Sequence, residues 1–160
     1  MKKDVLQAFA TRVTQANKTE LVVIIYEAAL ASIEEGRKAL HAGAIPEARR
    51  EIGSARDLIA ELMRSLDMKY NISTYLMELY RFGHRELCNA MAYRDTKHLD
   101  NAAHILEGIL PSFKELAKQD ESGPVMQNSQ TIVAGLTYGP GSDLRETIGV
   151  GIGSSRGFQA

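Results

Sequence analysis

The chain has 160 residues, of which 44% are hydrophobic and 24% charged, and its formal net charge is −1. This length and hydrophobic fraction suit one globular domain with a sizeable core. The nearly balanced charge gives no sign of a surface for nucleic acid or for an anionic membrane. The single cysteine, Cys88, excludes an internal disulfide and favours a reducing compartment.

The sequence shows none of the apolar segments that direct proteins into or across membranes. The first residues, MKKDVLQAFATRV, include two lysines but no apolar stretch, so we expect no signal peptide. No apolar run approaches the ~20 residues that span a bilayer. We therefore expect a cytoplasmic protein with no membrane insertion.

Glycine and proline divide the chain into three segments. They are sparse over residues 17–120, whereas residues 121–160 hold eight of the thirteen glycines and two of the four prolines. We predict a helical domain over 17–120 and a flexible or surface-docked, Gly-rich tail over 121–160. Residues 1–16 precede this domain as a separate N-terminal segment.

The first helix is predicted from Asn17 to about His41. Asn17 and Glu20 have the spacing of a capping box, in which two side chains satisfy free amides at the helix start. Gly43 suits a cap after the end of this helix, and Pro46 suits the first turn of the next one.

The other three helices are predicted from apolar residues that recur at intervals of three and four. The second helix has the cleanest stripe, formed by Ala48, Ile52, Ala55, Ile59, Leu62, Met63 and Leu66. The third begins near Ile72 after a cap at Asn71, and its stripe contains Ile72, Leu76, Leu79, Tyr80, Gly83, Leu87 and Met91. The fourth begins near Asp95 or Thr96, and its stripe contains Leu99, Ala103, Leu106, Leu110, Phe113 and Ala117.

Four helices of roughly 20–25 residues joined by short loops predict an all-α fold, an antiparallel four-helix bundle. Pro111 lies inside the fourth helix and should kink it, because proline removes a backbone hydrogen bond. A less regular all-helical packing is the alternative, and only this kink favours it.

Two of the predicted helices carry more apolar residues than one core-facing stripe needs. On a helical wheel, Val23, Tyr26 and Leu30 fall near the edge opposite the first helix's core side. Tyr75 and Phe82 are similarly offset from the stripe of the third helix. We expect another part of this chain or another protein to cover these five residues. The alternative is that they are the flanks of a wide bundle core.

Three segments of the chain resemble the FliS family of flagellar export chaperones. The family's first-helix signature resembles TQANKTELVVIIYEAAL, the end of its second helix resembles ARDLIAELMRSLDMKYNIS, and part of its third resembles LMELYRFGHREL. The segments occur in the family's order over about residues 9–117. The chain departs from the family at Glu27, where Asp is usual, and at Tyr75, where Asn is frequent. No Trp ends the fourth helix.

The resemblance implies a small helical bundle that binds the disordered C-terminal segment of flagellin. The family blocks premature polymerisation of flagellin and then docks at the export gate protein FlhA. The surplus apolar surface thereby acquires a role, since a disordered amphipathic segment can bury its apolar face in grooves between helices. We expect the flagellin-binding residues to be Val23, Tyr26, Leu30, Tyr75 and Phe82.

Two segments outside the predicted bundle are candidates to cover this surface within the chain itself. In the N-terminal segment Val5, Phe9 and Val13 are four apart, so a short helix could dock through Phe9. The family's N-terminal segment can occupy part of the client site, which fits this interpretation. In the tail, the uncharged decapeptide 130–139 supplies three further candidates, Ile132, Leu136 and Tyr138.

No catalytic or metal-binding motif is complete, so we expect a non-enzymatic protein without a cofactor or metal. There is no P-loop, and GIGSSRG has Arg156 where a dinucleotide-binding motif needs its third glycine. His84 and Cys88 are one helical turn apart, but two ligands do not make a metal site. His98, three residues after Asp95, is expected to be a solvated side chain.

A different function is indicated by AAHILEGIL around His104, which resembles the histidine-phosphotransfer signature found on other four-helix bundles. On the wheel His104 lies opposite Leu106 and Leu110, so it should be exposed as that reaction requires. However, Glu107 stands where the signature has lysine, and its charge would repel a phosphoryl group. This function, or that of another helical partner-binding module, is the alternative to the flagellin chaperone.

Overall fold

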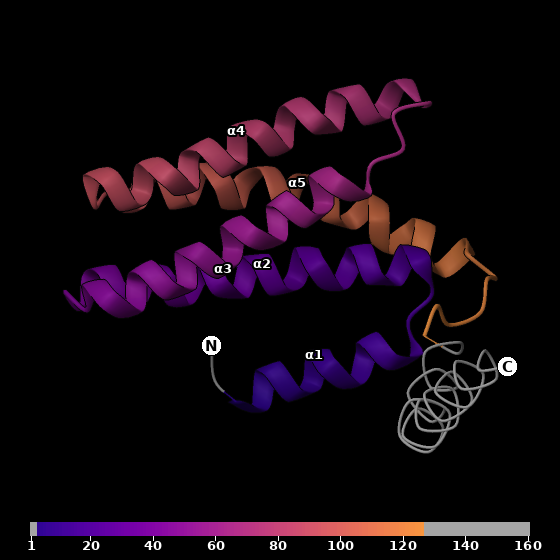
Figure 1. Cartoon of the computed structure of the whole chain (residues 1–160), viewed down its shortest axis with the longest axis horizontal. Helices are drawn as coiled ribbons and strands as arrows, with labels where there is room; N and C mark the ends of the chain where they lie inside the picture. The colour runs from indigo at the N-terminus through magenta and orange to yellow at the C-terminus, as the bar shows by residue number, and fades with distance from the viewer. Residues whose placement is uncertain (1–2, 127–160) are drawn as a thin grey trace, which may run out of the picture. The chain divides into compact units, whose positions relative to one another are not determined.

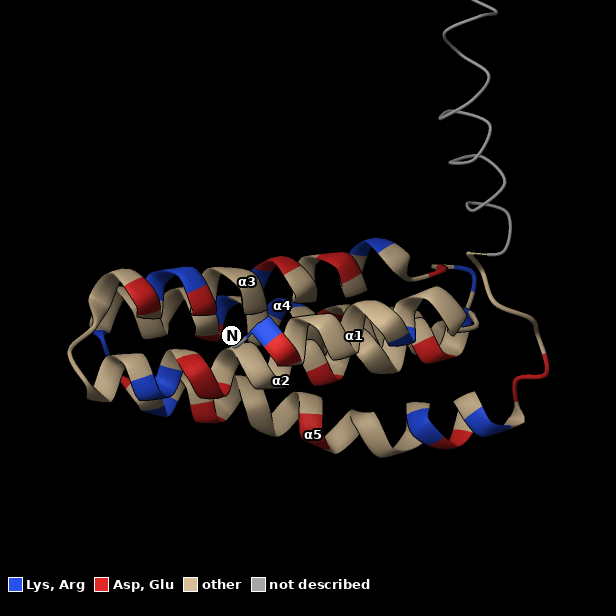
Figure 2. Cartoon of the chain, turned by 90° about the horizontal axis from the view of Figure 1, so that it is seen from below, with Lys and Arg blue, Asp and Glu red and all other residues tan. Residues whose placement is uncertain are grey.

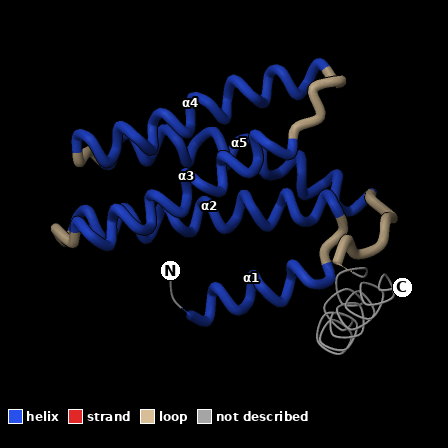
Figure 3. The backbone as a smooth tube through the Cα atoms, in the orientation of Figure 1, coloured by secondary structure: helices blue, strands red, loops and turns tan. Residues whose placement is uncertain are grey.

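The computed structural model describes residues 3–126, and this part of the chain is helical apart from its connecting loops (Figures 1 and 3). The helices are α1 (Lys3–Gln15), α2 (Lys18–His41), α3 (Ile45–Ser65), α4 (Asn71–Tyr93) and α5 (Thr96–Gln119). The expectation of an all-helical fold is confirmed. There are five helices in the described range because the N-terminal segment forms a helix of 13 residues.

Helices α2 to α5 form a closed set of neighbours around one core. Helix α2 packs against α3 and α5, and α4 packs against the same two helices. Consecutive helices run in opposite directions, as the colours of Figure 1 show. The largest fully buried apolar side chains come from all four of these helices: Tyr26, Ile33, Ile52, Ile59, Leu62, Tyr80, Leu87, Leu99 and Leu106.

The outer faces of α2, α3 and α5 carry many charged residues. Figure 2 shows that positive and negative residues are interspersed along α2, α3 and α5 rather than gathered in one block. Many of them form ion pairs one helical turn apart, such as Arg64 with Glu61 and Arg81 with Glu78. Such pairs contribute little to stability but keep the surface hydrated. None of the described helices has the length and apolar character required to cross a membrane.

The signals predicted for the start of α2 and for the turn between α2 and α3 are confirmed. The amide of Glu20 donates to Asn17 Oδ1 at 2.8 Å, and the amide of Asn17 donates to Glu20 Oε2 at 2.9 Å, which completes the capping box. Gly43 has φ +70, in the left-handed region that favours glycine. Pro46 lies in the first turn of α3, where its missing amide costs nothing.

The expectations for α4 and α5 were partly wrong. The residue that caps α4 is Tyr70 rather than Asn71, and no side chain hydrogen-bonds to the free amides there. Ile72 is 61% exposed instead of lying in the buried stripe, because it sits in the first turn of α4 at the end of the helix set. Asp95 caps α5 as predicted, and α5 continues through Pro111 without a break.

Hydrogen bonds around Asp120 join the start of α2 to the end of α5. Asn17 Nδ2 donates to the backbone carbonyl of Asp120 at 3.1 Å, and Thr19 Oγ1 donates to its Oδ2 at 2.5 Å. Hydrogen bonds from Ser122 and Thr19 lower the pKa of Asp120 to about 2, so its carboxylate is charged at neutral pH. The two ends of the α2–α5 unit are therefore held side by side.

Candidate functional site

The five residues predicted to bind flagellin separate into two groups. On α2, Tyr26 is fully buried, Val23 is 6% exposed, and Leu30 is partly buried against the core. On α4, Tyr75 is 66% exposed and Phe82 is 36% exposed. The expectation that all five lie outside the core is therefore wrong for Val23, Tyr26 and Leu30, and it holds for the two residues of α4.

Tyr26 is buried because α4 and α5 each offer it an aromatic partner. Its hydroxyl shares a hydrogen bond with the hydroxyl of Tyr80 on α4. Its ring centroid lies 5.4 Å from that of Phe113 on α5. Burial, reinforced by the hydroxyl contact, raises the pKa of Tyr26, and burial also raises that of Tyr80, so both remain neutral. Tyr26 thus belongs to the packing that holds the helices together.

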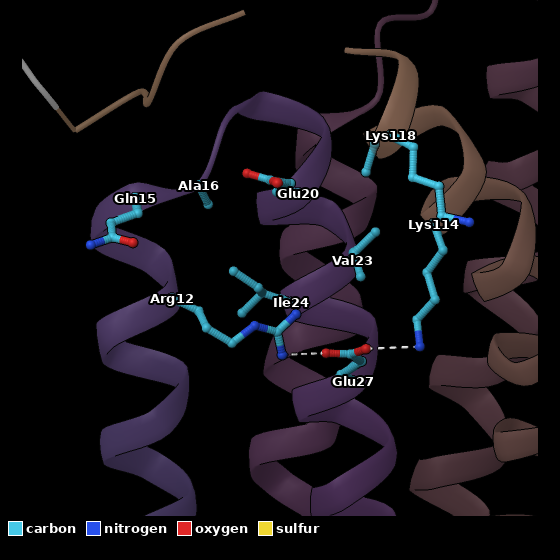
Figure 4. A pocket seen from close by; sticks show the side chains of 10 residues that line it. Arg12, Gln15, Ala16, Glu20, Val23, Ile24, Glu27, Lys114 and Lys118 are labelled. Carbon is cyan, nitrogen blue, oxygen red and sulfur yellow. Dashed lines mark hydrogen bonds and ion pairs between the residues drawn. The ribbon is translucent and has the colours of Figure 1, made fainter. Parts of the chain in front are cut away.

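Val23 lines a groove between α1, α2 and α5, with a volume of about 490 Å³ (Figure 4). Val23 and its neighbour Ile24, which is 5% exposed, provide apolar lining on α2. The remaining lining residues are Arg12, Gln15, Ala16, Glu20, Glu27, Lys114, Ala117 and Lys118. The groove therefore combines an apolar patch with charged rims, a combination suited to an amphipathic segment.

Glu27 connects the two walls of this groove. Its Oε2 accepts a hydrogen bond from Arg12 Nη1 of α1 at 2.5 Å, and its Oε1 lies 2.9 Å from Lys114 Nζ of α5 (Figure 4). Burial opposes ionisation of this carboxyl, but the hydrogen bonds from Arg12 and Lys114 outweigh it and lower the pKa of Glu27. One carboxylate thus holds α1 and α5 to α2.

Helix α1 forms one wall of the groove but buries little of its own surface there. None of its residues is buried, and α2 is the helix against which it mainly packs. Phe9, the residue predicted to dock, is partly buried, whereas Leu6 is 53% exposed. Because docking free energy grows with the apolar area removed from water, a helix that buries so little should detach readily. The other candidates for this covering role, Ile132, Leu136 and Tyr138, lie outside the described residues and stay predictions.

A second apolar surface runs along α4 and the loop before it. Tyr75 and Phe82 continue a row that begins with Ile72, and the α3–α4 loop adds Met68 and Tyr70, each more than half exposed. A group of exposed apolar side chains of this kind is typical of a binding site. Tyr75 and Phe82 face solvent and are accessible to a partner, and their role in binding flagellin stays a prediction.

A buried carboxylate between α4 and α5 was missed by the sequence analysis. Glu86 is 6% exposed and accepts hydrogen bonds from Asn101 Nδ2 at 2.6 Å and Asn89 Nδ2 at 3.3 Å, and it lies 3.0 Å from His98 Nδ1. These contacts, that of Asn101 foremost, lower the pKa of Glu86. His98 is therefore not a solvated side chain as expected but joins the two helices. The sequence held one signal for this burial: Glu86 lies three residues after Gly83, a member of the predicted stripe, and residues three apart lie on the same face of a helix.

Residues considered for catalysis or metal binding do not assemble into a larger site. His84 Nδ1 lies 3.9 Å from Cys88 Sγ, as their spacing indicated. Within residues 3–126, no three His, Cys, Asp or Glu side chains are placed to share a metal ion. His104 is exposed, as the wheel indicated, and so is Glu107, one turn away.

The comparisons with known proteins identify the family. Residues 1–120 match the family described as flagellar protein FliS. The chain belongs to the FliS family. This is a family of flagellar chaperones, and the match spans all five helices, which confirms the resemblance seen in the sequence.

A search of solved structures supports the same fold. One similar chain is described as "Crystal structure of flagellar chaperone from bacteria", with a TM-score of 0.60 at 15% sequence identity. The likeness covers 72% of this chain and 98% of that one. A comparison with curated proteins found no match.

Proposed function

We propose that this FliS-family protein is a cytoplasmic, non-enzymatic chaperone for the disordered C-terminal segment of flagellin. Helices α2–α5 act as an antiparallel four-helix bundle whose outer surface binds the segment. Binding of the segment prevents premature polymerisation of flagellin. The loaded complex is then delivered to the export apparatus through FlhA. The observation that supports this most directly is the groove with its apolar patch on α2, flanked by a helix, α1, that buries none of its own residues.

The surface suits a client that is disordered before it binds. Ordering a long segment costs several kcal/mol, so its site must offer a broad apolar area in compensation. The groove beside Val23 and Ile24 provides one part of this area, and the row on α4 with Tyr75 and Phe82 provides another. A segment that wraps around the bundle would bury both.

Helix α1 acts in this proposal as a placeholder on α2. It shields Val23 and Ile24 from water in the free protein, and it is held by few contacts, among them the ion pair of Arg12 with Glu27. A client helix that buries more apolar surface can displace it. Exchange of one amphipathic helix for another keeps the apolar patch of α2 in contact with a helix in both states.

The test is a calorimetric titration of the full chain with a peptide of the C-terminal segment of flagellin. A one-to-one complex is expected, with a gain in helicity measured by circular dichroism. Phe82→Asp should weaken binding at least tenfold, because it places a charge on the apolar row of α4. Arg12→Ala should strengthen binding a few-fold, because it loosens α1.

The matched control is Arg64→Ala, which removes an ion pair on α3 away from the groove. This variant should bind the flagellin peptide with the same affinity as the unmodified chain. Absence of binding would refute the proposed client. Weaker binding by Arg12→Ala would show instead that α1 belongs to the client-binding surface.

A further inference from the structure

A second groove shares no residue with the proposed client site, although one of its walls is α4, the helix that also carries Tyr75 and Phe82. It runs between α3 and α4 and has a volume of about 330 Å³. We call it the basic groove, and its lining residues are Arg49, Ile52, Gly53, Arg56, Leu87, Met91 and Ala92. It shares neither a residue nor a helix with the groove between α1, α2 and α5.

The shape of the basic groove allows another backbone to come close. Ile52 and Leu87 are buried and form an apolar floor, and Met91 is half-buried beside them. A Cβ atom placed on Gly53 would meet no heavy atom within 4 Å, and Ala92 is exposed. Small residues above an apolar floor let the side chains of a docked helix reach that floor.

The charge of the groove is unbalanced. Among residues 3–126, neither Arg49 nor Arg56 has a carboxylate within ion-pair distance, and no acidic residue lines the groove. Five other arginines are ion-paired in the same part of the chain: Arg12, Arg37, Arg50, Arg64 and Arg81.

The positive charge also reaches neighbouring groups. Arg56 Nη1 lies 4.0 Å from Cys88 Sγ. Burial, together with the charge of Arg56, lowers the pKa of His84 and keeps it neutral, although nearby Asp57 acts in the opposite direction. The two guanidinium groups are thus available to a partner, and the bundle itself does not neutralise them.

We propose that the basic groove docks an amphipathic helix of a partner protein, with carboxylates flanking the helix's apolar face. Arg49 and Arg56 are seven residues apart on α3, which is about 10 Å along the helix axis. A partner helix lying along α3 would therefore present two carboxylates seven residues apart. Apolar residues three and four positions after the first carboxylate would fill the floor. Guanidinium groups bind carboxylates through paired hydrogen bonds, which would fix the register of the helix.

An acidic helix fits these observations better than a nucleic acid does. Two cationic groups on an apolar floor offer few phosphate contacts, and the whole chain has a net charge of −1. A client that binds the groove between α1, α2 and α5 and the row with Tyr75 and Phe82 contacts none of the residues that line the basic groove. The chaperone could therefore hold its client and a second partner at the same time.

The test uses a fluorescein-labelled synthetic helix with two glutamates seven residues apart and leucines at the third and fourth positions between them. Anisotropy should show micromolar binding to the full chain that weakens as salt rises. The variant R49Q/R56Q should bind at least tenfold more weakly. The matched control R64Q/R81Q removes the same charge from ion-paired positions and should bind within twofold of the unmodified chain.

A third variant, Gly53→Leu, separates docking from folding. The leucine side chain should fill the groove and abolish binding, while Tm stays equal or rises because leucine favours helix more than glycine does. A peptide with lysines in place of the glutamates should not bind. Saturation with the flagellin segment should leave the affinity for the acidic peptide unchanged.

Several outcomes would overturn the proposal. The first is that the acidic peptide does not bind at millimolar concentration, and the second is that the lysine peptide binds as tightly as the acidic one. The third is that R64Q/R81Q loses as much affinity as R49Q/R56Q, and the fourth is that a single-stranded RNA binds as tightly as the acidic peptide. Competition with the flagellin segment would show that the two sites are one. A concentration-dependent dimer that R49Q/R56Q abolishes would assign the groove to a second copy of this chain.

Discussion

The apolar surplus of α2 and that of α4 look alike in the sequence, yet they lie in different environments. On α2, Tyr26 is in the core and Val23 lies beside α1, whereas on α4 Tyr75 and Phe82 face solvent. The difference follows from the neighbours, since α2 packs against α1, α3 and α5, and α4 packs against only α3 and α5 among the described helices. A run of apolar residues shows that a helix needs cover, but the topology decides whether the chain itself supplies it.

The largest expected effect is the difference in stability loss between a tyrosine substitution on α2 and one on α4. Tyr26→Ala should lower the free energy of unfolding by about 3–5 kcal/mol, because it leaves a cavity among three helices. Tyr75→Ala should change it by less than about 0.5 kcal/mol, since its side chain is 66% exposed. Urea unfolding followed by circular dichroism measures both. Equal losses would mean that the two tyrosines do not differ in burial.

The hydroxyl pair between α2 and α4 should give the next largest effect. Tyr26→Phe or Tyr80→Phe leaves the partner's buried hydroxyl without a hydrogen bond, which costs about 1–3 kcal/mol. The double variant should lose less than the sum, because it leaves no unpaired hydroxyl. A double-mutant cycle in urea measures this coupling. Additive losses would show that the two hydroxyls act independently.

A smaller effect is expected for the docking of α1 on α2. The pKa of Glu27 lies below its ordinary value of 4.5, so its ion pair stabilises the docked α1 above that pH. This contribution, about 1 kcal/mol or less for a partly exposed pair, disappears as pH falls through the lowered pKa. Since the chain has no tryptophan, Phe9→Trp provides a fluorescence reporter of α1 release.

The reporter should show release of α1 on acidification, with a midpoint below pH 4.5. Adding Glu27→Gln to the reporter variant should loosen α1 at neutral pH and remove most of the acid transition. Glu61→Gln, which breaks an ion pair on α3, is the control and should change neither. A transition that persists unchanged in Glu27→Gln would assign it to another group.

The smallest effect is expected at His104, an exposed polar residue of α5. His104→Gln should leave both the unfolding free energy and the affinity for the flagellin segment unchanged within error. Incubation of the unmodified chain with a phosphorylated receiver domain should transfer no phosphoryl group. Transfer that His104→Gln abolishes would favour the phosphotransfer function over the chaperone.

The parts of the fold that depend on local chemistry could be predicted from the sequence. Asn17 with Glu20, Gly43 and Asp95 each act within one helix end, so their residue types were sufficient. The stripe of α3 was also clear, because one side of that helix is polar throughout.

The parts that depend on contacts between distant segments could not be predicted in this way. The burial of Tyr26 needs Tyr80, 54 residues later, and that of Glu86 needs Asn101 on the next helix. Periodicity records which side of a helix is apolar, but it does not record how many helices lie against that side. The basic groove was missed for the same reason, since Arg49 and Arg56 look like ordinary surface charges until α4 is placed beside them.

The hydrogen bonds of Asp120 with Asn17 and Thr19 have a consequence for engineering. Because they hold the first residue of the α2–α5 unit beside its last, a short linker can join these two points. The exposed turn at Gly43 then offers a place to open the chain. The unit is thus suited to circular permutation, which would move the free ends to the turn at Gly43 and put the linker in the place where α1 is now attached.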